Sequence, residues 1–266
     1  MARRRLDAEL VRRGLVATRT EAQEAVRSGL VLVGGSPASR PSSLVAPGDA
    51  VHLQAPARRF VSRGGEKLAA ALDRFGIRAD GRSCLDAGAS TGGFTECLLQ
   101  RGAVRVAAVD VGYGQLAWRL RNDPRVTVLE RTNVRRLSPE DIPFVPDLVT
   151  ADVSFISLRV VVPALARLAV LGADFVLLVK PQFEAGARAV GKGGVVRDPG
   201  VWRESIAHVA EAGRALGLAP RAAMASPLLG PAGNVEFPLH LVLGGEETPF
   251  DLDEAIAEGL AVKGEA

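Results

Sequence analysis

One run of residues limits the fold of this 266-residue chain more than any other part of it. The run extends from Ser83 to Asp110 and reads SCLDAGASTGGFTECLLQRGAVRVAAVD. A short apolar strand, a glycine-rich turn, a helix, a second strand and a terminal acid follow one another without interruption. Because glycine has no Cβ, such a turn lets the backbone bend tightly and approach a ligand. The pattern therefore predicts a βαβ unit of an α/β fold that holds a nucleotide-like cofactor.

The spacing of the small residues separates the classes of cofactor. The motif is D-x-G-x-x-x-G-G, and Ser90 stands where dinucleotide sites carry the glycine against which pyrophosphate packs. S-Adenosylmethionine has no phosphate, so the motif favours this cofactor over NAD or a purely structural βαβ unit. Asp110 lies 22 residues after Gly88, where a carboxylate can accept hydrogen bonds from both ribose hydroxyls. The candidate cofactor-binding residues are Asp86, Gly88, Ser90, Thr91, Gly92, Gly93, Phe94, Asp110, Thr132, Asn133 and Asp152. Of these, Thr132 and Asn133 are expected to contact adenine, and solvent-facing turn residues are the alternative.

The rest of the chain after residue 60 continues the alternation of strands and helices. Aromatic residues are only 5% of the composition, so Ala, Val and Leu must fill the core, as they do in parallel sheets between helices. We predict a Rossmann-like α/β fold, with a doubly wound, mostly parallel seven-stranded sheet and a final antiparallel strand. Further strands are expected at 126–129, 148–152, 175–180, 222–226 and 237–243, and helices at 65–75, 115–122, 158–169 and 201–216.

The first 55 residues carry a different pattern, that of a small α+β module. Two short amphipathic helices are expected at 7–13 and 20–28, and short strands at 30–33 and 51–53. The leucine-rich helix, the A-x-x-x-V-x-x-G-x-V spacing that begins at Ala22 and the late P-G-D turn resemble the S4 RNA-binding domain.

Charge is unevenly distributed and supports that resemblance. Residues 1–60 hold ten arginines and five acidic residues, a net charge of +5, whereas the remainder carries −2. Such an excess suggests contact with a polyanion such as RNA, although a solvated arginine-rich surface is the alternative. The resemblance places the RNA contacts at Arg3, Arg4, Arg5, Arg12, Arg13, Arg19 and Arg27.

These patterns divide the chain and indicate where it acts. We expect an S4-like domain at 1–55, a linker at 56–62, the α/β domain at 63–250 and a C-terminal tail at 251–266. No run of about 18 apolar residues is present, and the first residues are too charged for a signal peptide, so we expect a cytoplasmic protein without a membrane span. Cys84 and Cys97 have no His or Cys neighbours in the sequence, which predicts core thiols and no metal site.

Four ionisable residues adjoin apolar stretches and would meet near the cofactor: Lys67, Asp152, Lys180 and Glu236. Each needs a partner if it is buried, and ligands of open α/β sheets bind at the carboxyl ends of the strands. Any one of them alone could form a structural salt bridge. Two lysines and two acids near one cofactor favour a catalytic network.

Six segments, in order along the chain, resemble the TlyA (hemolysin A) family of ribosomal RNA 2′-O-methyltransferases. They are VSRGGEKL around Lys67, LDAGASTGGF, TADVSFISL around Asp152, LVKPQFE around Lys180, GGVVRDP, and GNVEF around Glu236. The resemblance implies an S4 domain joined to an FtsJ-like class I methyltransferase domain, with those four residues as the family's catalytic tetrad. It also implies S-adenosylmethionine as cofactor and ribosomal RNA or ribosomal subunits as partners, methylated at cytidine in small or large subunit RNA.

One segment departs from the family pattern. An R-x-W-V tetrapeptide is common there, but the linker of this chain reads Arg58-Arg59-Phe60-Val61. Phenylalanine keeps the aromatic surface and loses the indole N–H donor. A role of the linker in cofactor binding is therefore less well supported than the tetrad.

The implied reaction assigns a role to one lysine. A ribose 2′-hydroxyl is a weak nucleophile until its proton is withdrawn, so we expect Lys180 to act as the base and the other three residues to position it and the hydroxyl. Two alternatives stay open. One is a hemolysin-like membrane-active protein, and the other is a non-catalytic RNA-binding protein with a methyltransferase fold.

Overall fold

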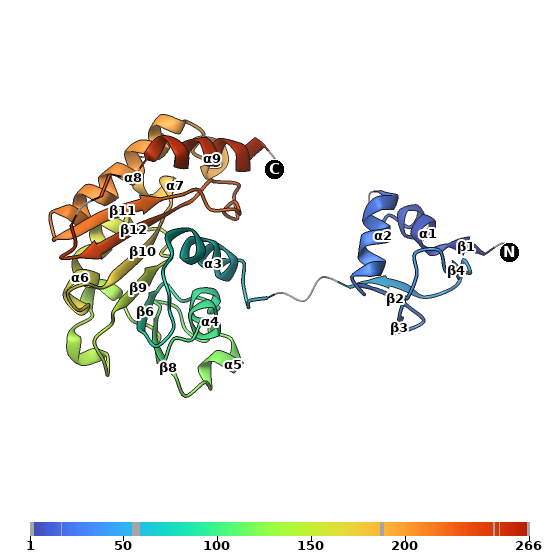
Figure 1. Ribbon diagram of the computed structural model, residues 1–266, viewed down its shortest axis with the longest axis horizontal. Helices are drawn as coiled ribbons and strands as arrows, with labels where there is room; N and C mark the ends of the chain where they lie inside the picture. Colours follow the sequence, from blue (N-terminus) through green and yellow to red (C-terminus); the bar gives the residue numbers. More distant parts are fainter. Residues whose placement is uncertain are drawn as a thin grey trace. The chain divides into compact units, whose positions relative to one another are not determined.

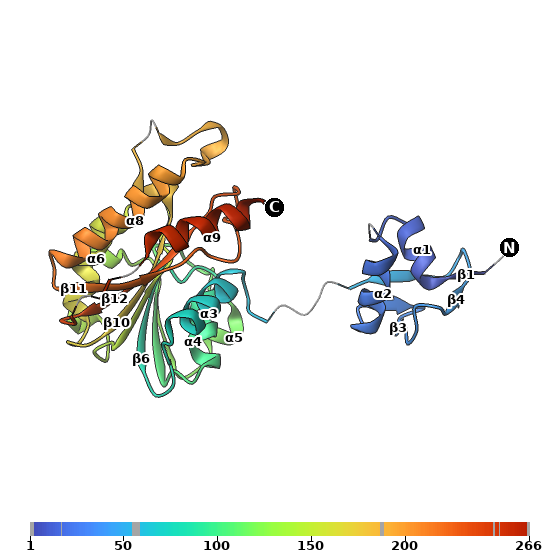
Figure 2. The same ribbon diagram turned by 45° about the horizontal axis from the view of Figure 1, so that its top comes forward.

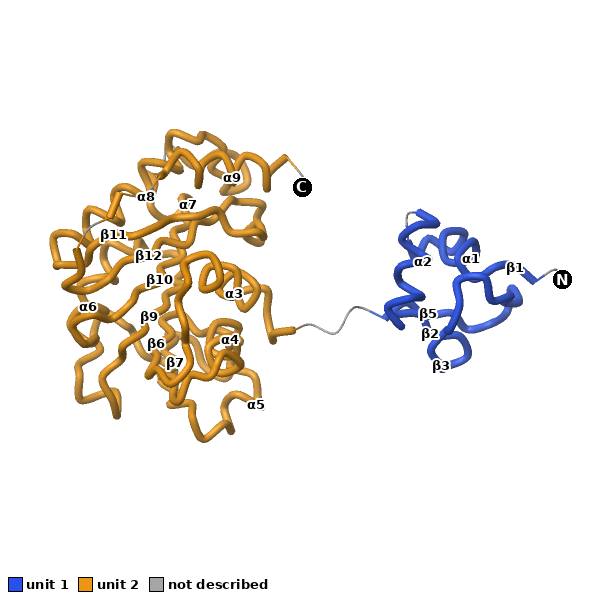
Figure 3. Tube along the Cα trace, viewed as in Figure 1, with its two compact units in different colours: residues 1–58 blue, residues 59–266 orange. Residues whose placement is uncertain are grey.

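The computed structural model describes residues 3–16, 18–54, 59–186, 189–246, 248–249 and 251–264. The chain forms two compact units, residues 1–58 and residues 59–266 (Figure 3). Each unit has its own hydrophobic core.

The larger unit contains, in its described residues, a seven-stranded sheet of order β11-β12-β10-β9-β6-β7-β8 (Figure 1). β12 runs antiparallel to both of its neighbours, and the remaining pairs are parallel. This topology confirms the predicted fold class. The strands are β6 Ser83–Ala87, β7 Arg105–Val109, β8 Val126–Leu129, β9 Leu148–Ala151, β10 Asp174–Val179, β11 Leu218–Ala223 and β12 Phe237–Leu243.

Helices cover both faces of this sheet because its strands are apolar on both sides. On β10, Val176 and Leu178 point to one face and pack under helices α3 (Gly64–Phe75), α4 (Gly93–Gln100) and α5 (Trp118–Arg121). Their neighbours on the strand point to the opposite face, which is covered by helices α6 (Leu158–Leu168), α8 (Pro199–Arg214) and α9 (Leu252–Gly264) (Figure 2). The single-turn helix α7 (Pro181–Glu184) and the 3₁₀ turns η1 (Val134–Arg136), η2 (Pro139–Asp141) and η4 (Lys192–Gly194) lie in the connections.

Two predicted elements differ from the structure by more than two residues at an end. The strand expected at 222–226 is β11, which begins at Leu218 and includes Pro220. Proline lacks an N–H, but β11 lies at the edge of the sheet and pairs with β12 alone, so the missing donor is tolerated. The helix expected at 115–122 shrinks to the four residues of α5, because the backbone N–H of Ala117 donates to Thr91 O and holds the preceding segment against the glycine-rich turn.

The segment expected as a tail, residues 251–266, contains helix α9. Ala255 and Ile256 are buried in the core that includes Phe237 of β12. A Cβ on Gly259 would lie 3.1 Å from the Phe237 ring, so the helix packs closely on the strand. The described residues of this segment therefore form part of the larger unit.

The smaller unit is built from helices α1 (Leu6–Arg12) and α2 (Arg19–Arg27) and short strands. The two helices confirm the prediction, and Thr18 begins α2 with a capping box to Glu21. Leu6, Leu10 and Val26 are part of its apolar core. The strands are β1 Arg4–Arg5, β2 Val31–Val33, β3 Ser36–Pro37, β4 Leu44–Val45 and β5 Val51–Leu53, paired as β1-β4 and as β3-β2-β5. The pairs formed by β1, β3 and β4 were not predicted, because a two-residue strand shows no periodicity.

The segment between the two units is described only in part. Residues 55–58, and with them the beginning of the linker expected at 56–62, lie outside the described residues. Phe60 is 2% exposed and packs on α3, where a Cβ on Gly65 would lie 2.2 Å from its ring. Phe60 is therefore part of the core of the larger unit.

Among the helices described here, none has the length and apolar character needed to cross a bilayer.

The packing of α9 can be tested by a pair of substitutions on the helix. Ile256→Ala should lower the free energy of unfolding by about 2 to 4 kcal/mol, because it leaves a cavity in the core. Leu260→Ala is the matched control, since Leu260 is 50% exposed, and should change stability little. Urea denaturation of the full-length protein measures both, and equal effects of the two substitutions would contradict the packing described here.

Candidate active site

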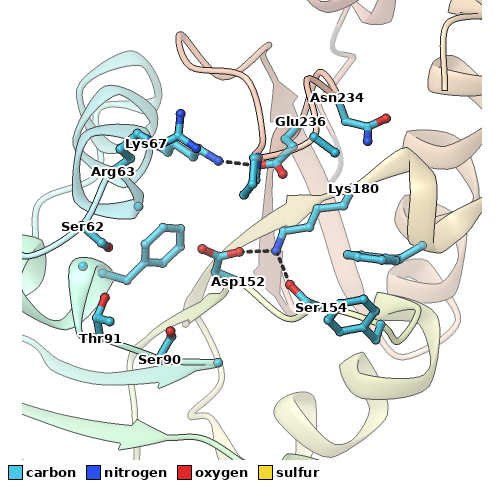
Figure 4. Close-up of a pocket in the computed structure, with 18 of the residues that line it drawn as sticks. Ser62, Arg63, Lys67, Ser90, Thr91, Asp152, Ser154, Lys180, Asn234 and Glu236 are labelled. Carbon is cyan, nitrogen blue, oxygen red and sulfur yellow. Dashed lines mark hydrogen bonds and ion pairs between the residues drawn. The ribbon is translucent and has the colours of Figure 1, made fainter. Parts of the chain in front are cut away.

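The topology of the larger unit gathers the four predicted tetrad residues at one edge of the sheet. The parallel strands end at this edge, and the antiparallel strand β12 begins there. Val179 pairs with Phe237, so Lys180 and Glu236 are the next residues at the same end of adjacent strands. Ala87 pairs with Ala151, which sets Gly88 beside Asp152 in the same way. Lys67 reaches this edge from α3 (Figure 4).

A cavity of about 590 Å³ lies at this edge, and all four tetrad residues line it. Its walls also include part of the glycine-rich turn. The members of that turn which face the cavity are Gly88, Ala89, Ser90, Thr91, Gly93 and Phe94. One cavity therefore contains both the predicted catalytic network and the predicted cofactor turn.

The tetrad consists of two lysine–carboxylate ion pairs (Figure 4). Lys67 Nζ lies 2.5 Å from Glu236 Oε2, and Lys180 Nζ lies 2.6 Å from Asp152 Oδ1. Lys180 also donates a hydrogen bond of 2.9 Å to Ser154 Oγ. Lys67, Lys180 and Glu236 are 6%, 8% and 1% exposed, so their charges are largely removed from water and depend on their partners.

The loop before β12 wraps around one of these pairs. A Cβ on Gly230 would lie 2.4 Å from Glu236 Oε1, so only glycine leaves room for the carboxylate at that position. Asn234 is buried, donates to the carbonyl oxygen of Gly194 and accepts from the N–H of Val196. These two bonds attach the loop around η4 to the side of the cavity that contains Glu236.

The glycines of the cofactor turn are required by packing. Gly88 has φ +87°, and a Cβ there would lie 2.5 Å from the carbonyl oxygen of Asp152. A Cβ on Gly92 would meet Leu120 at 2.3 Å. Because Gly88 has no side chain, the turn after β6 lies directly against Asp152, the first residue of the loop that follows β9.

Asp86 was predicted as a cofactor-binding residue, but it lies beneath the turn. It is fully buried and does not line the cavity. Thr95 Oγ1 donates a 2.7 Å hydrogen bond to its carboxyl group, and Thr150 Oγ1 lies 3.4 Å from the other oxygen. Burial raises the pKa of Asp86 to about 7. The position of Asp86 indicates support of the turn from within the sheet.

Asp110 supports the turn from the other side. Its two carboxylate oxygens accept hydrogen bonds from the backbone N–H groups of Ser90 (2.8 Å) and Gly112 (2.7 Å). Ser90 Oγ donates to Gln115 Oε1 at 3.3 Å, so the segment that contains Gln115 lies against the glycine-rich turn. The space beside Asp110 is about 10 Å³, roughly what one water molecule needs.

The two residues predicted for adenine binding follow β8. The backbone N–H of Thr132 donates to Asp110 O, and the Asn133 side chain accepts from the N–H of Arg135 and so begins η1. Neither residue lines the large cavity. Their contact with adenine stays a prediction, as does the contact of Asp110 with ribose.

The cavity also has residues that the sequence analysis missed. Phe155 has φ +63° and is 92% exposed, and its ring centre lies 5.2 Å from that of Phe183. Lys180 Nζ lies 5.9 Å from the centre of the Phe183 ring. Both aromatic residues lie a few positions after a strand end, in TADVSF and KPQF, and that position was the available signal. The remaining lining residues that were missed are Ser62, Arg63, Gly64, Ala89, Ser154, Gln182, Gly194, Pro231, Ala232 and Asn234.

Glu184 connects the two loops that contain these aromatic residues. It is 5% exposed and lies at the end of α7, after β10. Its carboxylate accepts from Ser157 Oγ at 2.5 Å and from the N–H of Leu158 at 2.7 Å, at the beginning of α6. Through these bonds the loop after β9 is held to the segment that follows Lys180.

The predicted RNA-binding arginines lie in the smaller unit, and most of them are ion-paired. Six are exposed, and Arg13 is half-buried. Arg13 pairs with Glu9 and also donates to the carbonyl oxygens of Pro47 and Asp49, so its guanidinium connects α1 to the turn before β5. The ion pairs of the others are Arg5 and Arg19 with Asp7, Arg12 with Glu9, and Arg27 with Glu24.

Comparison with known proteins assigns the chain to a family. The profile of FtsJ-like methyltransferases matches residues 60–242, and that of the S4 domain matches residues 4–51. The 16S/23S rRNA (cytidine-2′-O)-methyltransferase TlyA of Mycobacterium tuberculosis is 56% identical over 243 residues, which cover 91% of each chain. The chain belongs to the TlyA family of FtsJ-like methyltransferases.

Other members of this family have a different name. Hemolysin A of Brachyspira hyodysenteriae is 37% identical over 90% of this chain and 100% of its own length. A solved structure of a hemolysin candidate from Streptococcus thermophilus is 38% identical, with a TM-score of 0.73, and the match covers 100% of this chain and 97% of that one. These matches confirm the predicted family, and its methyltransferase domain implies use of S-adenosylmethionine.

The buried position of Asp86 predicts a pH-dependent stability. A carboxyl group whose pKa is raised in the folded state costs stability as the pH rises, because the unfolded chain releases that proton at lower pH. Asp86→Asn removes this cost and keeps an acceptor for Thr95. The variant should therefore gain stability relative to the wild type between about pH 4 and pH 7, with no further gain above that range. Urea denaturation across this range measures the difference, and a difference that does not change with pH would contradict the prediction.

Proposed function

We propose that the protein transfers a methyl group from S-adenosylmethionine to the 2′-hydroxyl of a cytidine in ribosomal RNA. The observation that carries the proposal is the common cavity, in which two lysine–carboxylate pairs face the glycine-rich turn of a methyltransferase sheet. The tuberculosis relative named above, with more than half of its aligned residues identical, has this activity in its name.

The residues around the cavity fit the cofactor. The cavity volume of about 590 Å³ lies within the range of ligand sites, about 300 to 1,000 Å³. Gly88, Ser90 and Thr91 would hold the cofactor through the backbone of the turn, and Phe94 and Asp152 would border it. When bound, S-adenosylmethionine supplies a methyl group on a positively charged sulfur.

We assign the removal of the hydroxyl proton to Lys180. A neutral amine at Nζ accepts this proton, and the ammonium that forms lies 2.6 Å from Asp152 Oδ1 and donates to Ser154 Oγ. The carboxylate therefore stabilises the charge that proton transfer creates. General-base assistance of this kind contributes about 10² to 10⁴-fold to the rate.

The second pair has a positioning role. Lys67 is held by Glu236 at 2.5 Å, and the loop around Gly230 restricts the carboxylate. An ammonium fixed in this way can donate to the ribose oxygen and direct its lone pair toward the methyl group, since alignment of the reacting atoms is itself a large part of catalysis. We assign the tetrad residues these roles as part of the proposal.

The smaller unit supplies affinity for the substrate. Its exposed arginines can bind the phosphates of RNA. Phosphate contacts provide affinity and orient the RNA, but they do not distinguish one nucleotide sequence from another. We therefore propose that the S4 unit recruits ribosomal RNA or a ribosomal subunit and that the cavity of the larger unit selects the nucleotide. The reaction would take place in the cytoplasm, where ribosomal subunits are assembled.

A methyl-transfer assay tests the proposal. The wild-type protein, incubated with radiolabelled S-adenosylmethionine and unmodified ribosomal subunits, should transfer label to cytidine ribose. Lys180→Ala should lower the rate at saturating substrates about 100-fold or more while cofactor binding persists. Lys263→Ala is the control, because Lys263 lies on α9 and does not line the cavity, and it should keep the wild-type rate.

Two outcomes would contradict the proposal. The first is a Lys180→Ala protein that methylates at the wild-type rate. The second is lysis of erythrocytes or vesicles by the wild-type protein without label in RNA, which would favour the activity named in the hemolysin relatives.

A further inference from the structure

A buried carboxylate lies beneath the exposed arginines of the smaller unit. Asp7, in the first turn of α1, is 0% exposed. Arg5 donates to it through Nε (3.1 Å) and Nη2 (2.8 Å), and the N–H of Ala8 donates at 2.8 Å. Arg19 Nη2 lies 3.4 Å away and Gln23 Nε2 3.3 Å away. A charge buried in this way depends on its partners, and here the partners come from β1, α1 and α2.

The two arginines on Asp7 keep most of their surface in solvent. The side chains of Arg5 and Arg19 are 46% and 56% exposed. A guanidinium has five N–H donors, and those not directed at Asp7 are available to a ligand. One carboxylate shared by two guanidiniums leaves a net positive charge at a single point of the surface. Such a pair matches the geometry and charge of a phosphate group.

We propose that Asp7 is a positioning residue for RNA binding, which holds Arg5 and Arg19 together as a preformed clamp for a backbone phosphate of structured RNA. The inference rests on the proposed function, since it takes ribosomal RNA as the ligand of the smaller unit. An arginine side chain loses rotamer freedom when it binds, so one that is already held in place binds with a smaller entropic cost. Asp7 touches no RNA itself and acts through the two arginines.

The other ion pairs of this unit differ from the Asp7 cluster. Glu9 is also buried and binds two arginines, but only Arg12 is about half exposed (49%). Arg13 is 21% exposed, and its guanidinium attaches α1 to the turn before β5. Arg27 and Glu24 are both exposed and 3.7 Å apart, an arrangement that fixes a side chain only weakly. Among the described residues, the Asp7 cluster alone combines a fully buried carboxylate with two arginines that are each about half exposed.

Asp7→Asn separates positioning from simple electrostatics because the two predict opposite results. The substitution removes one negative charge, and charge alone would strengthen binding to RNA. If Asp7 positions the arginines, the dissociation constant of the full-length protein for unmodified ribosomal RNA should instead rise about tenfold, as measured by fluorescence anisotropy over a range of salt concentrations. Glu24→Gln is the matched control: it removes the same charge from an exposed pair and should leave binding unchanged or slightly tighter.

A second background tests whether Asp7 acts through the arginines. In a protein that carries Arg5→Ala and Arg19→Ala, Asp7→Asn should cause no further loss of RNA affinity, whereas damage to the fold would lower the affinity in this background as well. The inference would be overturned if the Asp7→Asn protein bound RNA as tightly as the wild type, or if the substitution weakened binding equally in both backgrounds. Either result would leave the proposed methyltransferase function intact. A wild-type protein that bound no ribosomal RNA would overturn the inference and the proposed function together.

Discussion

Two lysine side chains buried at one edge of a sheet, each paired with a single carboxylate, are the interaction on which the candidate active site depends. Buried ion pairs add little to stability, because the cost of removing two charges from water offsets their attraction. The Lys67–Glu236 and Lys180–Asp152 pairs are therefore weak contributors to stability, and the role proposed for them is catalytic. They place two amines in a cavity that also has the glycine-rich turn, and this arrangement suits proton removal from a hydroxyl beside a methyl donor.

Strand direction makes this arrangement possible. A parallel neighbour would carry the residue before β12 to the opposite edge of the sheet, whereas the antiparallel strand brings Glu236 next to Lys180. At the other strand pair, Gly88 has no Cβ to strike the carbonyl oxygen of Asp152, so the cofactor turn and the loop after β9 lie in contact. The positions of the site residues are thus set mainly by the backbone, through strand direction and the close contact at Gly88.

The sequence predicted the parts of the site that follow from topology and missed those that follow from packing. Lys180 and Glu236 adjoin long apolar strands, so their meeting could be inferred from strand order. Asp86 is buried beneath the turn because α4 packs on β6, and the spacing of residues in the sequence does not reveal this packing. Likewise, the arginine excess was visible in the composition, but the buried position of Asp7 beneath it was not.

Lys180→Arg distinguishes a base at this position from a positive charge alone. Arginine keeps the positive charge and can still pair with Asp152, but it is not deprotonated in proteins and so cannot accept the hydroxyl proton. The measurement is the single-turnover rate of methyl transfer to unmodified ribosomal subunits at saturating cofactor. If Lys180 is the base, the rate should fall about 100-fold or more while cofactor binding is retained. A rate close to that of the wild type would show that a positive charge is sufficient at this position and would contradict the role of Lys180 as base.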